Sequence, residues 1–237
     1  MEENNDKNIS NSTAWVGSKS VKCTNNVNIP RNTSQTVVLI IFDQAENYYG
    51  AFRNEMIVNI PVFRAYGHGE FLGISKCVRC FEGSFPMNSG VAVLSFDNQK
   101  EAMSCLQSKT QIREADWMGA PEMYIVPLCN PIKNLNDWNI MQIDFYDVKN
   151  GVNFTKYLNT LEEIVRKHGG LIVAGTSDMT RFRGVGRPAY VLIYQWTNLC
   201  QAQNFNKEVD GLLTNAGAAC STRAVVDMDP YDNRSLD

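Results

Sequence analysis

The chain has 237 residues, of which 44% are hydrophobic and 20% are charged, and this balance is ordinary for a globular protein. Its formal net charge of −3 provides no positive field for collecting nucleic acid, and the sequence contains no long basic block. No apolar stretch approaches the roughly 18 residues that a membrane span needs, and no secretory hydrophobic region follows Met1. We therefore expect a protein inside the cell, in the cytoplasm or the nucleus, that binds neither nucleic acid nor membranes.

Residues 1–34 are rich in Asn, Ser, Thr and Lys, and their few apolar residues, among them Trp15 and Ile29, are isolated. Such a segment cannot bury enough apolar surface to offset the entropy that it would lose on ordering. We therefore predict a disordered arm over residues 1–34.

From residue 35 onward, one order of predicted elements appears twice. The first copy, over residues 35–130, predicts a strand at 37–43, a helix at 46–66, strands at 71–81 and 91–96, a helix at 98–113 and a strand at 123–128. Pro61 removes a backbone donor and should kink or break the first of these helices.

A polar linker at 131–137 precedes the second copy, which covers residues 138–230 and is followed by a polar tail at 231–237. This copy predicts a strand at 140–147, a helix at 152–168, strands at 171–182 and 190–196, a helix at 198–213 and a strand at 223–228. Asn153 is a plausible cap for the first helix, and Gly169-Gly170 supplies the left-handed residue that ends it.

The order is βαββαβ in both copies, which predicts an α+β protein made of two similar domains. The strand that begins at Val37 is apolar on both of its faces. One face can cover helices, so the other must meet a second layer, most simply the sheet of the other repeat.

Short sequences at the helix ends and hairpins of the two copies carry a family resemblance. They are Ile60-Pro61, Tyr66-Gly67, Phe81-Glu82-Gly83, Lys167-His168-Gly169-Gly170, Phe182-Arg183-Gly184, Arg187-Pro188, and Trp196-Thr197-Asn198 with Ala202 and Phe205. Together they resemble an uncharacterised family, a domain of unknown function, within the ferredoxin-like superfamily of dimeric α+β barrels. The resemblance implies two ferredoxin-like repeats that close sheet to sheet as a barrel, a pseudo-dimer within one chain that could associate further.

The two histidines, His68 and His168, each follow the first helix of a copy. A histidine at that place interacts favourably with the carbonyl end of the helix, and such a capping role needs no ligand. The resemblance adds an alternative, because the superfamily includes haem-binding and oxygenase members, some of which use a histidine.

Seven cysteines in irregular spacing indicate no disulfide framework, and we expect buried free thiols. Cys77 and Cys80 form a CxxC, but no second CxxC and no histidine pair complete a zinc site. A Gly-rich phosphate loop, a nucleophile elbow and a defined pair of catalytic carboxylates are also missing from the sequence. We therefore assign no catalytic residue, no metal and no cofactor.

A cluster of polar residues is predicted in the second copy, at positions where the first copy is apolar. In the strand at 140–147, alternation places Gln142 and Asp144 on one face and apolar residues on the other. Ferredoxin-like strand order would bring Tyr190, Leu192 or Tyr194 to one side of Asp144 and Arg223 or Val225 to the other. The candidate ligand-binding residues are Gln142, Asp144, Tyr190, Tyr194, Arg223 and His168.

Two interpretations of this group stay open. One half of the barrel could carry a pocket for a small molecule, since such pockets combine apolar walls with a few polar groups. Alternatively, Arg223 could simply neutralise a buried Asp144. We expect a non-catalytic module that binds a protein partner or a small ligand, with a cofactor-free oxygenase or isomerase as the alternative. A cavity that reaches Asp144 would favour a ligand, and a filled barrel with an exposed apolar patch would favour a protein.

Overall fold

The computed structural model describes residues 28–43, 48–83, 89–108 and 121–231. The first repeat contains β1 (Thr36–Asp43), α1 (Tyr48–Val58), α2 (Ile60–Arg64), β2 (Glu70–Gly83), β3 (Ser89–Phe96), α3 (Gln99–Gln107) and β4 (Glu122–Pro127). The second contains β5 (Ile140–Val148), α5 (Gly151–Lys167), β6 (Leu171–Thr176), β7 (Thr180–Arg183), β8 (Tyr190–Trp196), α6 (Leu199–Leu213) and β9 (Ala218–Pro230). The predicted start of the first helix at residue 46 and most of the stretch at 108–113 lie outside the described residues.

Each repeat has the strand order of a ferredoxin-like domain. In the nine-stranded sheet, β1 lies between β3 and β4, and β5 lies between β8 and β9, with the order β6-β8-β5-β9-β2-β3-β1-β4-β7. The predicted fold class, two βαββαβ repeats packed as an intrachain barrel, is confirmed. Three predicted elements differ in extent: the helix expected at 98–113 ends at Gln107 before an extended Ser108, the strand expected at 171–182 is split into β6 and β7, and the last strand is longer than expected.

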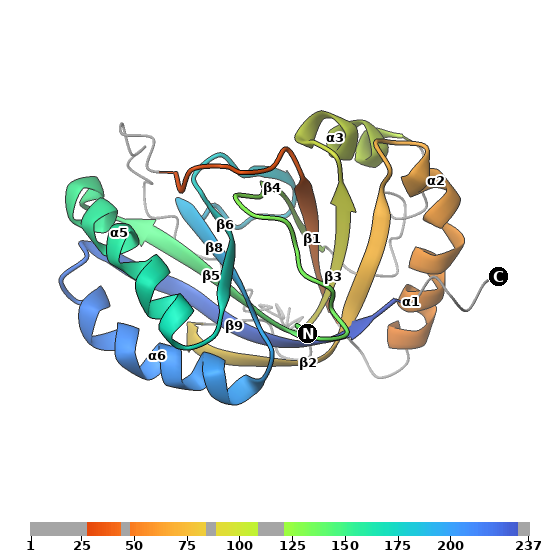
Figure 1. The fold of residues 1–237 in the computed structure, drawn as a ribbon. Helices are drawn as coiled ribbons and strands as arrows, with labels where there is room; N and C mark the ends of the chain where they lie inside the picture. The colour runs from red at the N-terminus through yellow and green to blue at the C-terminus, as the bar shows by residue number, and fades with distance from the viewer. Residues whose placement is uncertain (1–27, 44–47, 84–88, 109–120, 232–237) are drawn as a thin grey trace, which may run out of the picture.

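The two repeats join at both ends of their sheets. The last strand of the second repeat, β9, pairs antiparallel with β2, and β7 pairs antiparallel with β4. Because β6 and β7 follow one another in the chain, the two ends of the strand order meet and the sheet curls closed (Figure 1). The backbone N–H of Cys129 donates to the carbonyl of Val173 over 2.8 Å and ties the end of β4 to β6.

The barrel is filled with apolar side chains from both repeats. Leu39, Val93, Ile143 and Ile193 are fully buried members of one cluster that draws on the sheets of both repeats. The helices cover the outside, with α5 and α6 on the second repeat and α1, α2 and α3 on the first (Figure 1). Each repeat therefore has a second core between its sheet and its helices, separate from the barrel interior.

Three of the described helices, α3, α5 and α6, begin with an asparagine cap. The side chains of Asn98, Asn150 and Asn198 accept from backbone N–H groups in the first turns of α3, α5 and α6. Asn150 takes the capping place that the sequence suggested for Asn153, and the N–H of Asn153 is the donor to it. Gly169 adopts a left-handed φ of 75° after α5, as predicted.

The predicted break in the first helix is present. The helix α1 ends at Val58 and α2 begins at Ile60, with Pro61 in the first turn of α2. Proline is tolerated there because that backbone N–H would have no helical partner.

The last part of the predicted arm contacts the second repeat. The N–H of Ile29 donates to Gly175 over 2.9 Å at the edge of β6, and Arg31 pairs with Asp178 over 3.0 Å. Residues 28–31 thus lie against the end of β6 and the loop that follows it, and Asn32 donates to the carbonyl of Cys129 after β4. Residues 1–27 lie outside the described part of the chain.

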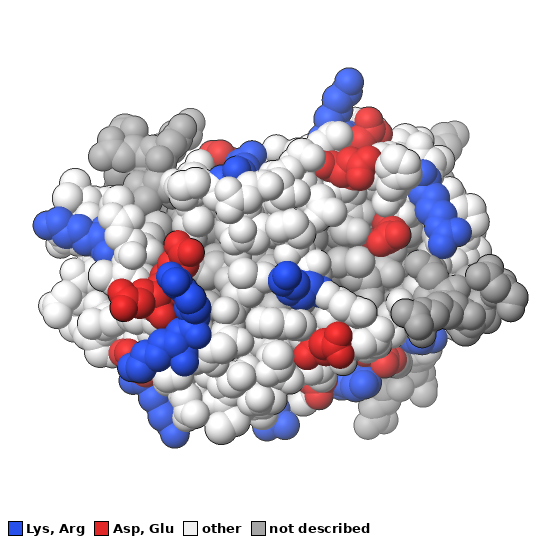
Figure 2. Space-filling view, viewed as in Figure 1, with Lys and Arg blue, Asp and Glu red and all other residues white. Residues whose placement is uncertain are grey.

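Charges of both signs are interspersed on the face shown in Figure 2, which has no extended area of one sign. Within the described residues, none of the helices combines the length and the apolar character needed to cross a bilayer.

Candidate functional site

The predicted polar residues face the helices of the second repeat, not the barrel interior. In β5, Met141, Ile143 and Phe145 belong to the barrel cluster, as the alternation predicted. Gln142 on the opposite face donates to Asn206 on α6 over 2.9 Å. The expectation that these polar groups line the barrel was therefore wrong. The apolar face of β5 meets the first repeat, and the polar face lies under α5 and α6.

Asp144 is the centre of a buried hydrogen-bond network. Its carboxylate accepts from Gln142 Nε2 at 3.0 and 3.1 Å, from the Tyr146 hydroxyl at 3.0 Å and from Arg223 Nε at 3.4 Å. The register places Asp144 opposite Arg223 in β9 and opposite Leu192 in β8. The predicted neighbourhood of Asp144 and Arg223 is thus present, and Arg223 is itself only 2% exposed.

Burial opposes ionisation of this carboxyl group. It raises the pKa of Asp144 from 3.8 to about 6, although Arg223, Gln142 and Tyr146 all favour the charged form. Burial also raises the pKa of the Tyr146 and Tyr194 hydroxyls, so both stay protonated and can act as donors.

This shift predicts how stability depends on pH. The folded-state pKa of Asp144 lies above its ordinary value, so the folded protein holds this proton more tightly than the unfolded chain does. The wild type should therefore lose about 3 kcal/mol of unfolding free energy as pH rises from about 3, below both pKa values, to about 7, above both. Asp144→Asn, which cannot ionise, should lack this component in denaturant titrations at each pH. Parallel pH profiles for the two proteins would contradict the prediction.

An open pocket of about 610 Å³ lies between α6, β9 and the end of β2. The second repeat contributes Gln203, Asn206, Lys207, Asp210 and Leu213 of α6, Thr214 directly after α6, and Ala218, Ala219, Cys220 and Arg223 of β9. The first repeat contributes Phe81 and Glu82. The pocket reaches Arg223 and Asn206, which contact Asp144 and Gln142, but Asp144 itself is sealed behind them.

Arg223 connects the sealed network to the pocket rim. Its Nη1 donates to Asp210 over 2.6 Å and lies 3.6 Å from Glu82, while its Nε faces Asp144. The side chains of Asp210 and Glu82 are 60% and 44% exposed. The buried guanidinium of Arg223 therefore contacts one buried carboxylate, that of Asp144, and two exposed ones. The site is therefore a polar floor beneath a partly apolar, solvent-open pocket.

Four of the six predicted residues come together here: Gln142, Asp144, Tyr194 and Arg223. Tyr194 pairs with Gln142 across β5 and β8, and its ring packs on Phe205 of α6 with centroids 5.1 Å apart. Tyr190 lies further along β8, where its ring meets Phe154 edge-on. It is a core residue beside the network.

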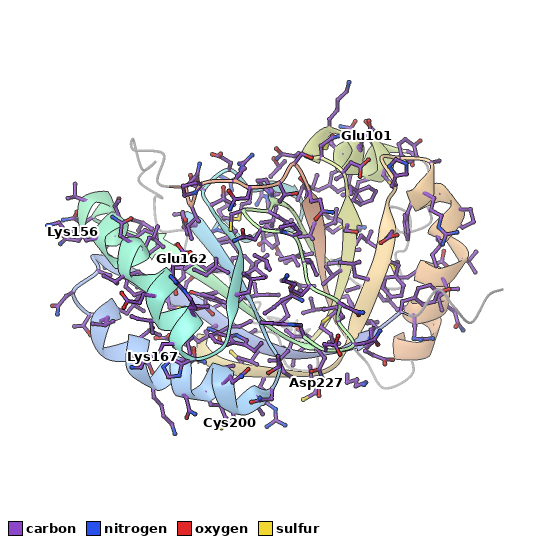
Figure 3. All side chains as sticks on the ribbon, in the orientation of Figure 1. Glu101, Lys156, Glu162, Lys167, Cys200 and Asp227 are labelled. Carbon is purple, nitrogen blue, oxygen red and sulfur yellow. The ribbon has the colours of Figure 1, made fainter. Side chains whose placement is uncertain are left out.

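His168 also lies apart from the pocket. It ends α5, and its Nε2 lies 2.7 Å from a carboxylate oxygen of Glu208 on α6. Lys167, at the end of α5 in Figure 3, pairs with the same carboxylate over 2.8 Å. These two contacts lower the pKa of Glu208. His168 therefore joins α5 to α6 through its side chain, a structural role that differs from the predicted capping of carbonyls.

The first histidine has a surface position. His68 has a left-handed φ of 47° and its Nδ1 lies 2.8 Å from Asp97, a contact that raises the pKa of the imidazole. Neither histidine lines the 610 Å³ pocket or the smaller pocket of about 210 Å³ near the linker. A haem held by a histidine, as the superfamily resemblance allowed, does not fit this arrangement.

Other metal chemistry has no evident place in the described part of the chain. No group of three or more His, Cys, Asp and Glu residues there is placed to hold a metal ion. The described cysteines are free, and half of them, Cys77, Cys80 and Cys200, are exposed, so the expectation of buried thiols was only partly right.

Sequence reasoning missed several groups of the site. Tyr146 carried a usable signal, because it lies two residues beyond Asp144 and alternation places it on the same face. Asn206 and Asp210 lie four residues apart on α6 and so share one helix face. Glu82 had no local signal, since it reaches Arg223 only through the pairing of β2 with β9.

The fold is shared with solved structures of very low sequence similarity. A candidate monooxygenase from Fusobacterium nucleatum superposes with a TM-score of 0.51 and 9% identity, covering 85% of this chain and 96% of that one. A candidate chlorite dismutase gives 0.51 and 12%, covering 83% and 95%. An anthrone oxidase-like protein gives 0.50 and 11%, covering 86% and 96%.

At identities this low, the likeness establishes the architecture alone. The chain has the dimeric α+β barrel fold of chlorite dismutase-like and monooxygenase-like proteins, built here from two repeats in one polypeptide. No family model and no curated protein matches the sequence.

Proposed function

We propose that the protein is a non-catalytic binding module whose pocket between α6, β9 and the end of β2 takes a small ligand. The observation that carries this proposal is the coincidence of an open pocket of about 610 Å³ with a buried polar floor centred on Arg223. Binding pockets in this size range combine apolar walls with a few placed polar groups. We also propose that the chain is related to the uncharacterised family of dimeric α+β barrels.

A small ligand is favoured over a large protein partner. The barrel is filled, yet the large exposed apolar residues in the described part of the chain lie on different elements: Val58, Phe81, Val152, Val185 and Leu212. Protein interfaces usually need a contiguous apolar patch, and isolated residues of this kind do not supply one. Only Phe81 among them lines the pocket, where it would contact a ligand.

Filling the pocket tests the proposal. Ala219 is an exposed pocket residue on β9, so Ala219→Trp should occupy the space without disturbing the Asp144 network. Native mass spectrometry of protein purified from its own source should show a retained small molecule on the wild type. We expect the variant to lose most of that added mass while keeping the same thermal unfolding midpoint within a few degrees.

The matched control is Val185→Trp. Val185 is 81% exposed in the loop before β8 and does not line the pocket, so this variant should retain the ligand like the wild type. A wild type that carries no ligand, or equal retention by both tryptophan variants, would overturn the proposal.

The raised pKa of Asp144 supports a second candidate function. A buried carboxyl group whose pKa is raised to about 6 by burial, beside Tyr146 and Arg223, has the properties of a general acid or base. A cofactor-free oxygenase or isomerase would need a movement that opens the pocket floor to Asp144. In that case, the ligand retained by Asp144→Asn should differ in mass or structure from the one retained by the wild type. Identical ligands on both proteins would speak for the binding module.

A further inference from the structure

Two buried nitrogen atoms beside the pocket lack a hydrogen-bond partner among the described residues. They are Nη2 of Arg223 and Nδ2 of Asn206, and both residues line the pocket. Their exposures are 2% and 5%. Leaving a buried donor unpaired costs about 1–3 kcal/mol, so an acceptor that reached these atoms would gain more than it would on an exposed surface.

The orientation of the Asn206 amide follows from its neighbours. Gln142 must present its Nε2 to the Asp144 carboxylate, which can only accept while ionised. The same Nε2 donates to Oδ1 of Asn206 over 2.9 Å. Asn206 is therefore left with its Nδ2 group unused, and that group is a donor.

The charges around the pocket do not favour an anion. The Arg223 guanidinium already faces three carboxylates, those of Asp144, Asp210 and Glu82, at 3.4, 2.6 and 3.6 Å. Lys207 is the other cationic residue of the pocket wall. Three carboxylates against two cations leave no excess of positive charge for a ligand carboxylate or phosphate. A ligand ammonium group fails for another reason, because it has no lone pair to accept from the two nitrogen atoms.

We infer that the pocket selects an uncharged ligand that presents a carbonyl oxygen to Arg223 and Asn206. This inference rests on the proposed function and names the chemistry of its ligand. The body of the ligand would lie against Phe81, Leu213 and Ala218, which form apolar parts of the wall. The two nitrogen atoms are covered in the free protein, so binding of the carbonyl group requires a side chain of the wall to move aside, and Asp210, which is 60% exposed and contacts Arg223, is placed to do so.

Three probes of one shape and different charge test the inference. Benzamide carries a neutral carbonyl group, benzoate a carboxylate and benzylammonium a cation. We expect titrations followed by protein NMR to give benzamide a Kd at least about tenfold lower than that of either charged probe. Ala219→Trp should abolish benzamide binding, because it fills the same space.

Variants on one helix separate donor loss from general disturbance. Asn206→Leu removes the donor and should weaken benzamide about tenfold while changing benzoate little. Asn204→Leu makes the same change at an exposed α6 residue that does not line the pocket, and it should change the Kd of benzamide less than about twofold. Retention of the fold is checked by the amide spectrum of each variant.

The outcomes distinguish the inference from the proposed function. Benzoate or benzylammonium binding as tightly as benzamide, or an Asn206→Leu variant with unchanged benzamide affinity, would overturn the carbonyl assignment. If one of these results were found while the wild type from its own source still carried a ligand that Ala219→Trp removes, the binding module would stand. Its ligand would then have a different chemistry. If no probe bound and no ligand were retained, both would fall.

Discussion

Arg223→Met should lower the free energy of unfolding by about 3–5 kcal/mol at pH 8, because it leaves Asp144 buried without its cation. Methionine keeps much of the apolar stem, so the loss reports the charge and its hydrogen bonds more than packing. Loss of the Arg223 cation raises the pKa of Asp144 further, so the deficit should shrink as pH falls from 8 to about 6 and stay at its smallest value below that, where Asp144 is protonated in both proteins. Denaturant titrations at several pH values measure both effects.

The control for this substitution is Arg181→Met. Arg181 is exposed and its guanidinium donates a long hydrogen bond of 3.4 Å to the backbone carbonyl of Gly186, so its loss should cost no more than about 0.5 kcal/mol. The double variant Arg223→Met/Asp144→Leu should recover much of the single-variant loss, because no buried carboxylate remains. An Arg223→Met protein as stable as the wild type at pH 8 would show that Asp144 is not charged or not buried.

Ile143→Ala should destabilise the protein by about 2–5 kcal/mol. Ile143 is fully buried in the cluster that fills the barrel, where residues of both repeats meet. Deleting its side chain removes apolar contacts and leaves a cavity that the rigid sheet can only partly close. Thermal and denaturant unfolding would both register the loss.

Val152→Ala provides the matched comparison, because Val152 is a β-branched residue that is 58% exposed at the start of α5. It should change the unfolding free energy by less than about 0.5 kcal/mol. Equal effects of Ile143→Ala and Val152→Ala would mean that the apolar face of β5 is open to water.

The main features of the fold followed from patterns that are local in sequence. The helical periodicity of 152–168 and the break at Pro61 are properties of short stretches, and both are present. The barrel followed from a strand, β1, that is apolar on both faces, combined with the repeat and the family resemblance. The split between β6 and β7 was not predictable in the same way. It depends on β7 leaving the second repeat to pair with β4 of the first.

The site was predicted less well, for a geometrical reason. Alternation separates the two faces of a strand but does not say which face meets the helices. Gln142 and Asp144 were therefore grouped correctly with Arg223 and then placed inside the barrel, whereas they lie beneath α6. The pocket wall contributed by Phe81 and Glu82 depends on the junction between repeats, which only the closed sheet defines.

The contrast between the repeats bears on how such a site could arise. In the second repeat, the outer face of the first strand carries Gln142 and Asp144, whereas Val38, Ile40 and Phe42 of β1 lie in the helix-side core of the first repeat. Among the described residues of the first repeat, those that line the site, Phe81 and Glu82, belong to the end of β2. A ligand there would therefore contact both repeats while the polar floor belongs to one.

The pairing of β2 with β9 closes the sheet and places Phe81 and Glu82 in the pocket wall. Hydrogen exchange tests this pairing directly. In two separate ferredoxin-like units, β2 and β9 would be edge strands with free backbone N–H groups that exchange quickly. The closed barrel predicts that peptides covering 77–80 and 224–227, which pair with each other, exchange as slowly as those of the central strands β1 and β5. Fast exchange in both peptides, with β1 and β5 still protected, would contradict the closed barrel and the pocket built on it.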